Sequence, residues 1–480
     1  MGVRGVSLRR AAAVLSVIGL LGACGSRLPD DALARYDAAS LGGGTGVAPT
    51  GATGAQQQAG TATTSPGATT GTNTGTAAGA NAGGGSTGAA DAGDGTAAAA
   101  DCHGGATDKG VTADEVKVAA MVTASGPLPG ATEGQYRGAA SYIAKINAEG
   151  GVCGRKITIV EGDDGLDPQR ARSEFLRLEP SVFAFVGSLA VADSGYTDLI
   201  GSTGVPYVGV SVDPSGRAYE NVMPHADPKI ASTGPYVYLQ QQHPNVKNVA
   251  FLYADIGGVR DNTPAVLEPL KKVGFNIVYN SGASATSPDY TPEVINMQRN
   301  GAQMVYLFAF ELNMHVRIAR NMRQQNFEPE LKVSQIGYNS QLISLLGDVA
   351  NGWVNPVTYE PMLDAAEPAQ SPALQDFLKW NNAVFPGAQV DLFPVNGWAS
   401  AALFVRGLKE AGADLTRAKL VQLINAIPED DGAGMIAPVR PADRLGSPCF
   451  IIEHIENQQW VREYPASGFE CNLGETFRFD

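Results

Sequence analysis

The sequence has little histidine and cysteine and no excess of positive charge. Among 480 residues there are five cysteines and five histidines, and 48 acidic residues outnumber 34 Lys and Arg, which gives a net charge of −14. Because phosphate backbones are bound by clustered Lys and Arg, this balance argues against a nucleic-acid partner. No cysteines and histidines fall at the spacing of a zinc site. We therefore expect no metal and no cofactor.

The sequence also lacks a long apolar run. No stretch approaches eighteen consecutive apolar residues, so no transmembrane helix is predicted. The apolar segment 11–21 follows three arginines and is too short to span a bilayer, which is typical of a signal peptide. It ends in Leu21-Gly-Ala-Cys24, which resembles a bacterial lipobox. That resemblance implies removal of residues 1–23 and a lipid on Cys24 that anchors the protein to the outer face of the cell membrane. The alternative is an ordinary signal peptide with an incidental cysteine.

Large apolar residues are almost absent from 41–100, which are mostly Gly, Ala, Thr, Ser and Gln. Such a segment cannot bury enough surface to fold, so residues 24–109 are predicted to be a disordered tether. Export implies an oxidising compartment in which disulfides persist. The four cysteines after Cys24 allow three pairings. We favour Cys102–Cys153, which would fix the end of the tether, and Cys449–Cys471, which would clip a hairpin.

The folded part is organised around the stretch from 147 to 172. Gly150 and Gly151 end a helix, Ile157–Val160 is a short apolar strand, and Asp167 and Pro168 begin the next helix. The same alternation of strand and helix occurs before and after this stretch and begins again after residue 224. It predicts an α/β fold with parallel sheets. Three helices near 374–426 could complete the first half, so the chain would cross between two halves more than once and form a hinge.

Two possible chemical motifs are weak. Asp163-Asp-Gly-Leu-Asp167 lacks the glycine placement and distal glutamate of a calcium loop and is better explained as a helix-capping turn. The segment Gly209-Val-Ser211-Val-Asp213 lacks the second glycine of a nucleophile elbow. We therefore predict no enzyme activity, and a secreted hydrolase is the least favoured alternative.

Several short segments, in this order and spacing, resemble the substrate-binding lipoproteins of branched-chain amino-acid ABC transporters, which are type I periplasmic binding proteins. These segments are Gly110–Val118, Ser125-Gly-Pro127, Ile146–Gly151 with Gly154-Arg-Lys156, Asp163–Pro168 and Phe185-Val-Gly187. The resemblance implies two Rossmann-like lobes joined by three crossovers, with the ligand in the cleft between them. The first lobe would comprise 110–224 and 358–436, and the second 225–357 and 437–480.

The resemblance also implies the ligand-binding residues. Ser125 is expected to contact the ligand, and the loops Ser188-Leu189-Ala190 and Ser211-Val-Asp213 are expected to hold its carboxylate. Alternatively, Ser211 and Asp213 only cap a helix near Pro214. The aromatic and acidic positions of the second lobe match Phe310 and Tyr338, with Asp255 or Glu311 as a substitute acid. Tyr338 stands where the family has an acid and Asp213 where it has a neutral hydroxyl, which argues against leucine, isoleucine or valine as the ligand.

The predicted function is capture of a small polar molecule, an amino acid or a related compound, and its delivery to a membrane ABC permease. A sensor of the same fold that reports to a signalling receptor is the main alternative. The sequence does not distinguish the two.

Overall fold

The computed structural model describes residues 102, 104–224, 227–364 and 371–479, all within one compact unit of the chain. The predicted signal peptide, Cys24 and the tether up to residue 101 lie outside the described residues. Residues 104–109, which the sequence places at the end of the tether, contact the first lobe: Thr107 donates to the Leu415 carbonyl, and Asp108 accepts from the Arg417 N–H. No helix in the described part is long and apolar enough to cross a membrane.

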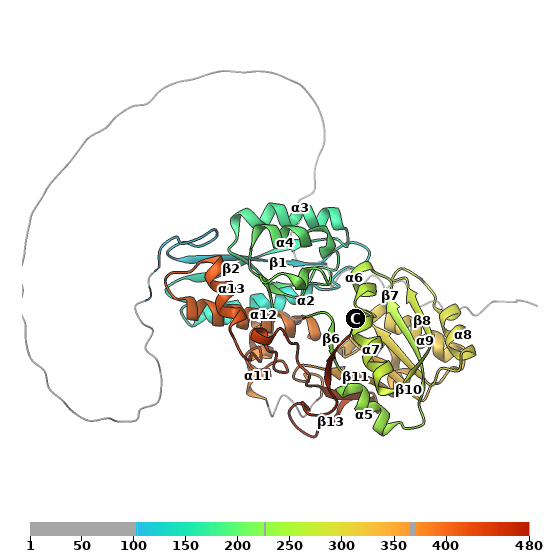
Figure 1. The fold of residues 1–480 in the computed structure, drawn as a ribbon. Coiled ribbons are helices and arrows are strands. Elements are labelled where there is room, and N and C mark those ends of the chain that lie inside the picture. The colour runs from blue at the N-terminus through green and yellow to red at the C-terminus, as the bar shows by residue number, and fades with distance from the viewer. Residues whose placement is uncertain (1–101, 103, 225–226, 365–370, 480) are drawn as a thin grey trace, which may run out of the picture. The chain divides into compact units, whose positions relative to one another are not determined.

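The first lobe is built on a parallel sheet with the strand order β2-β1-β3-β4-β5. Its strands are β1 (Glu115–Val122), β2 (Lys156–Asp163), β3 (Ala184–Ser188), β4 (Tyr207–Gly209) and β5 (Val222–Met223). Helices cover both faces: α2 and α12 lie on one, and α3 and α4 on the other (Figure 1). Successive residues of β1 alternate between the two apolar cores, since Val118 belongs to one and Ala119 to the other.

Helices from two distant parts of the sequence complete this lobe. They are α2 (Glu133–Ala148), α3 (Pro168–Leu178) and α4 (Thr197–Thr203), followed much later by α11 (Pro372–Val384), α12 (Leu392–Ala411) and α13 (Arg417–Asn425). α12 packs against α2, β3 and β4. The approach of α2 and α12 requires glycine: a Cβ at Gly138 would lie 1.8 Å from the Pro394 carbonyl oxygen, and one at Gly397 would lie 1.9 Å from that of Gln135.

The stretch from 147 to 172 folds as its local signals predict. Gly150 and Gly151 have φ values of 112° and 84° and follow the last turn of α2, a conformation that glycine adopts at little cost. Asp167 caps α3 by accepting from the N–H groups of Gln169 and Arg170, both at 2.8 Å. Pro168 occupies the first helical position, where no N–H is needed.

The second lobe contains a mixed sheet with the order β13-β12-β11-β10-β9-β7-β8. Strands β7 to β11 pair in parallel, whereas β12 pairs antiparallel with β11 and β13. The strands are β7 (Asn248–Ala254), β8 (Asn276–Ala283), β9 (Met304–Phe308), β10 (Leu331–Ser334), β11 (Trp353–Val357), β12 (Ile451–Glu456) and β13 (Gln459–Tyr464). The helices are α5 (Gly234–Gln242), α6 (Gly257–Asp261), α7 (Pro264–Val273), α8 (Thr291–Arg299), α9 (Leu312–Gln324) and α10 (Ser340–Leu346).

Short elements complete the described chain. A separate antiparallel pair is formed by β6 (Ile230–Ser232) and β14 (Thr476–Arg478). Single 3₁₀ turns are η1 (Glu179–Ser181), η2 (Asp193–Gly195), η3 (Gly216–Ala218), η4 (Gly347–Ala350) and η6 (Pro441–Asp443). The helix expected near Pro214 is only the η3 turn, because the chain must rejoin the sheet at β5 a few residues later.

The chain passes between the lobes after β5, after β11 and before β12. These passages are hydrogen-bonded to one another: the Ala437 N–H donates to the Thr358 carbonyl, and the Asp227 N–H to the Arg444 carbonyl. The structure also contains the two favoured disulfides, Cys102–Cys153 and Cys449–Cys471. The second closes the segment that contains the predicted β12–β13 hairpin.

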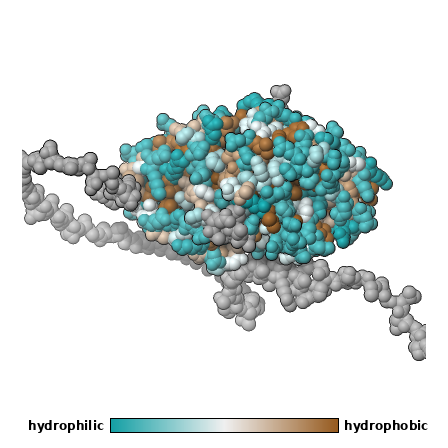
Figure 2. Space-filling view, turned by 90° about the horizontal axis from the view of Figure 1, so that it is seen from below, coloured by the Kyte–Doolittle hydropathy of each residue, from teal (hydrophilic) through white to brown (hydrophobic). Residues whose placement is uncertain are grey.

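Exposed large apolar side chains are few. One face of the molecule is mostly hydrophilic with scattered hydrophobic residues (Figure 2). Among the described residues the exposed large hydrophobics are Leu176, Val210 and Leu345. Val210 follows β4 directly, so it lies at the edge of the sheet where the predicted binding loops begin.

Candidate functional site

The loops predicted to bind ligand in the first lobe leave the carboxyl ends of neighbouring parallel strands. The segment around Ser125 follows β1, Ser188-Leu189-Ala190 ends β3, and Ser211-Val212-Asp213 follows β4. Ligands of open α/β sheets bind at this edge. The structure therefore brings these three segments to one side of the sheet, although their side chains have different surroundings.

Ser125 belongs to an ion-pair network. Its hydroxyl donates to Asp163 at 2.5 Å and accepts from Arg170 at 3.1 Å. Burial alone would raise the pKa of the Asp163 carboxyl, but hydrogen bonds from Ser125, Gly165 and Ala124 lower this pKa below its ordinary value. Asp163 therefore stays ionised and fixes the loop after β1 beside the end of β2.

Ser188 and Ala190 are fully buried. The Ser188 hydroxyl accepts from the Met121 N–H at 3.0 Å, which joins β3 to β1. The Leu189 N–H donates to the Met121 carbonyl at 2.9 Å, and the Leu189 carbonyl accepts from the Thr132 hydroxyl. The polar groups of Ser188 and Leu189 that were expected to face a ligand are thus used to hold the sheet and its first loop together.

The loop after β4 surrounds a carboxylate that sequence reasoning missed. Asp193 is 1% exposed, and its side chain accepts from the Val212 N–H at 2.7 Å, the Asp213 N–H at 2.9 Å and the Ser211 hydroxyl at 2.9 Å. Burial raises the pKa of Asp193 to about 7; these hydrogen bonds oppose the rise, and the charge of Asp213 contributes to it. An acid in the loop after a buried strand was the available signal for this residue.

The alternative that Ser211 and Asp213 only cap a helix agrees with the contacts of Asp213 but not with those of Ser211. Asp213 accepts from the N–H and hydroxyl of Ser215, at 2.9 and 2.7 Å, and so caps the turn before η3. Ser211 is 2% exposed and bonds to Asp193, with its hydroxyl also 3.0 Å from the Asp213 carbonyl. Ser211 therefore caps no helix, contrary to that alternative.

The candidate acids of the second lobe already have partners. Asp255, just past β7, forms an ion pair with Arg260. Glu311 caps α9 by accepting from the N–H groups of Asn313 and Met314, both at 2.8 Å. Neither acid is positioned as an isolated charge awaiting an ammonium group.

The two candidate aromatic residues are buried in the core. Phe310 is 0% exposed and lies beside the Tyr290 ring, with a centroid distance of 6.0 Å. Tyr338 is 1% exposed, packs against Trp460 at 4.7 Å, and accepts from the Leu363 N–H at 2.7 Å. In this conformation neither ring offers a surface to solvent, so their contact with a ligand stays a prediction.

The loops of the two lobes meet at Val212. Asn262, just past α6 of the second lobe, donates to the Val212 carbonyl at 2.7 Å and accepts from the Arg217 guanidinium. A Cβ at Gly258 would lie only 2.7 Å from Val212 Cγ1, so glycine allows this approach. Burial lowers the pKa of Arg217, while Asp193 and Asp213 oppose that effect. Asn262, Gly258 and Arg217 carry no sequence motif and were not predicted.

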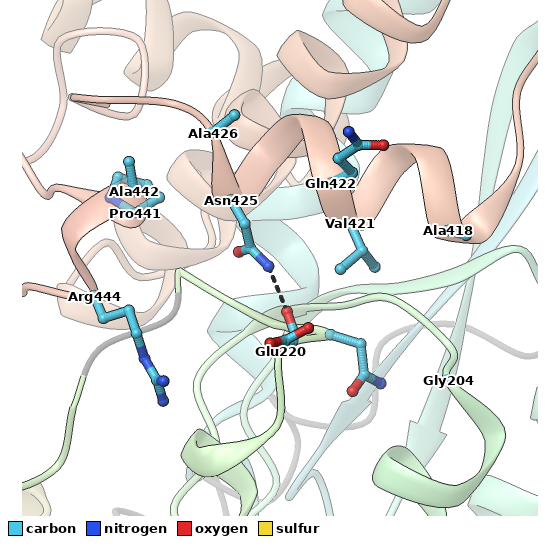
Figure 3. A pocket seen from close by; sticks show the side chains of 11 residues that line it. Gly204, Glu220, Ala418, Val421, Gln422, Asn425, Ala426, Pro441, Ala442 and Arg444 are labelled. Atoms are coloured by element: carbon cyan, nitrogen blue, oxygen red, sulfur yellow. Dashed lines mark hydrogen bonds between the residues drawn. The ribbon is translucent and has the colours of Figure 1, made fainter.

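A cavity of about 650 Å³ lies at the opposite edge of the first sheet (Figure 3). It is bounded by α13, by Gly204 before β4 and by Glu220 before β5, and Asn425 donates to the Glu220 carbonyl at 2.7 Å. No predicted ligand-binding residue lines it. Among the described residues, no three His, Cys, Asp or Glu side chains are grouped to hold a metal ion.

Comparison with known proteins decides the family. A family model described as "Periplasmic binding protein" matches residues 115–459. The chain belongs to this family. The predicted family and its fold of two α/β lobes are thereby confirmed, and since its relatives are solute-binding proteins, the chain is a binding protein rather than an enzyme.

The similar proteins are distant in sequence. The Leu/Ile/Val/Thr-binding protein of Salmonella typhimurium is 24% identical over 310 residues, which cover 62% of this chain and 84% of the relative. A fatty acid ABC transporter substrate-binding protein from Thermomonospora curvata has a TM-score of 0.62 at 18% identity and covers 76% of this chain and 95% of its own. A branched-chain amino acid transporter substrate binding protein from Streptococcus pneumoniae, solved with isoleucine, has a TM-score of 0.58 at 15% identity. The match covers 73% of this chain and 100% of that protein. At these identities the solved structures show the fold alone.

Proposed function

We propose that this periplasmic binding protein captures a small polar ligand, an amino acid or a related compound, between its lobes and delivers it to a membrane ABC permease. The observation that carries the proposal is the contact of Val212 with Asn262, because it joins the ligand-edge loops of two sheets that are linked by hinge-like passages. A ligand that stabilises the conformation with this contact over a more open one would be retained until the permease separates the lobes.

The boundaries of the lobes at 110–224 with 358–436, and at 225–357 with 437–480, are part of this proposal. So are the ligand contacts of Ser125, Ser188, Leu189, Ala190, Ser211, Asp213, Asp255, Phe310 and Tyr338. The names of the relatives, which include binders of leucine, isoleucine, valine and threonine as well as a fatty acid carrier, support a small organic solute without selecting one.

We also propose that cleavage before Cys24 and lipidation of this cysteine anchor the protein outside the cytoplasm. The tether would then let the lobes reach the permease while remaining near the membrane.

A thermal-shift screen of the full mature protein tests capture, using amino acids, amides, polyamines and aromatic acids. We expect at least one of these compounds to raise the melting temperature. Uptake of that compound by cells should then fall when the gene is deleted. Normal uptake combined with loss of a transcriptional response to the compound would favour sensing instead.

A further inference from the structure

The loop after β4 forms an anion-binding nest. Two successive N–H groups and one hydroxyl, from Ser211, Val212 and Asp213, converge on one carboxylate at 2.7–2.9 Å. Adjacent backbone N–H groups that point to one place bind anions, and such charge-assisted hydrogen bonds are short and strong. The nest lies at the carboxyl edge of the sheet, where a ligand anion would be expected.

The anion in this nest belongs to the chain itself. Asp193 is fixed by its own backbone, because its carbonyl accepts from the Tyr196 N–H at 2.9 Å and the Thr197 hydroxyl at 2.8 Å. The nearby charged groups are Asp213, whose side chain caps its own turn, and Arg217, whose guanidinium donates to Asn262. The side chain of Asp193 therefore receives its donors from one loop, while two further hydrogen bonds anchor its backbone carbonyl.

The donors of the neighbouring loop are occupied in the same way. The Ala192 N–H donates to the Asp164 carboxylate at 2.8 Å, and the Val191 N–H donates to the Thr123 hydroxyl at 3.0 Å. Val210, beside the nest, is apolar and 38% exposed. Beside the nest, this edge is thus partly apolar, and the backbone donors of Val191 and Ala192 are already bonded within the chain.

We propose that Asp193 is a built-in substitute for a ligand carboxylate, and that the ligands of this cleft are small amides rather than free carboxylic acids. This inference rests on the proposed function, since it assumes that the ligand enters this cleft. It makes Asp193 a specificity-determining residue, because its carboxyl group occupies the donors that a second carboxylate would need.

Removing the Asp193 carboxylate from the nest tests whether this side chain substitutes for a ligand carboxylate. In the full mature Asp193→Ala protein, sodium acetate at pH 8, with chloride at equal ionic strength as reference, should refill the nest. We expect a rise in melting temperature of about 2 °C at an acetate concentration about tenfold above its dissociation constant. The wild type should not respond. Asp167→Ala is the matched control, because Asp167 also accepts two N–H groups but at an exposed helix end. A folded Asp193→Ala protein that does not respond to acetate overturns the proposal, as does an equal response of all three proteins.

Matched ligand pairs test the proposed ligand class in the wild-type protein. This test remains possible even if the Asp193→Ala variant fails to fold. Leucine is compared with leucinamide, and phenylalanine with phenylalaninamide, by thermal shift and calorimetry at pH 8. We expect the amide to bind at least tenfold more tightly than its acid in any pair that binds. Tighter binding of the free acid overturns the ligand class. If no member of either pair binds while acetate rescues Asp193→Ala, the role of Asp193 stands and the proposed class of solute fails.

Discussion

The contact between the lobes predicts that Asn262→Ala opens the cleft. Asn262 contributes two hydrogen bonds across the lobes, one to the Val212 carbonyl at 2.7 Å and one from Arg217. In the open form water replaces both partners, so each bond stabilises closure by its net value of about 1 kcal/mol. Loss of about 2 kcal/mol shifts the closed-to-open ratio about thirtyfold, and the affinity for a ligand that requires closure falls by up to the same factor.

The assay uses double electron–electron resonance without ligand to measure the distance between two spin labels. The labels are placed at Leu176 and Leu345, which are exposed positions on α3 and α10 of the two lobes. The variant should populate longer distances than the wild type, and calorimetry with the ligand from the thermal screen should show the weaker binding. Asn300→Ala is the matched control, since Asn300 is the C-cap residue of α8 and its amide donates to the Asn296 carbonyl of the same helix. Unchanged distances and unchanged affinity in a folded Asn262→Ala protein would refute the reasoning.

Three further predictions concern stability and location. Arg417→Met should lower the melting temperature by roughly 5 °C in calorimetry. It breaks a 2.7 Å ion pair with the buried Glu179, which costs about 3 kcal/mol because Glu179 keeps only its 3.3 Å pair with the more exposed Lys109 among the ion pairs of the described residues. Arg177→Met at an exposed pair should have little effect. The pKa of Asp193 in the folded state, about 7, lies above that of free aspartate, about 3.9. The stability that this group contributes is therefore fully present below about pH 3.9 and is lost as the pH rises through about 7. Denaturant titrations over this pH range should show the loss in the wild type relative to Asp193→Asn, and the same pH dependence of the unfolding free energy in both proteins would contradict it. Cys24→Ser should move the protein from the membrane fraction to the soluble extracytoplasmic fraction, and an unchanged membrane fraction would exclude the lipid anchor.

Local signals made most of the fold predictable. Gly150, Gly151, Asp167 and Pro168 act within a few residues of themselves, so their effects on α2 and α3 follow from the sequence. Strands β5, β6 and β14 are only two or three residues long, which is too short for an apolar period to be recognised. Their existence depends on pairing with distant segments.

The site was harder to predict because its contacts join distant residues. Asp193 meets Ser211 eighteen positions later, and only the parallel arrangement of β3 and β4 brings their loops together. Tyr338 lies just past β10, a position typical of a cleft, yet Tyr359 and Trp460 from remote segments cover its ring. A position beyond a strand end therefore identifies the right edge of the sheet but not whether a side chain faces ligand or core.

The same loop connects ligand choice with closure. Within the first lobe its N–H groups are held by Asp193, and across the cleft the Val212 carbonyl is held by Asn262. Because one peptide segment carries both sets of bonds, a group that displaced the Asp193 carboxylate would also move the carbonyl that meets the second lobe. Free carboxylic acids are then disfavoured twice, by competition with Asp193 and by loss of the contact that closes the lobes. A ligand without a free carboxylate avoids both costs, which is the reason for proposing small amides as the ligands of this cleft.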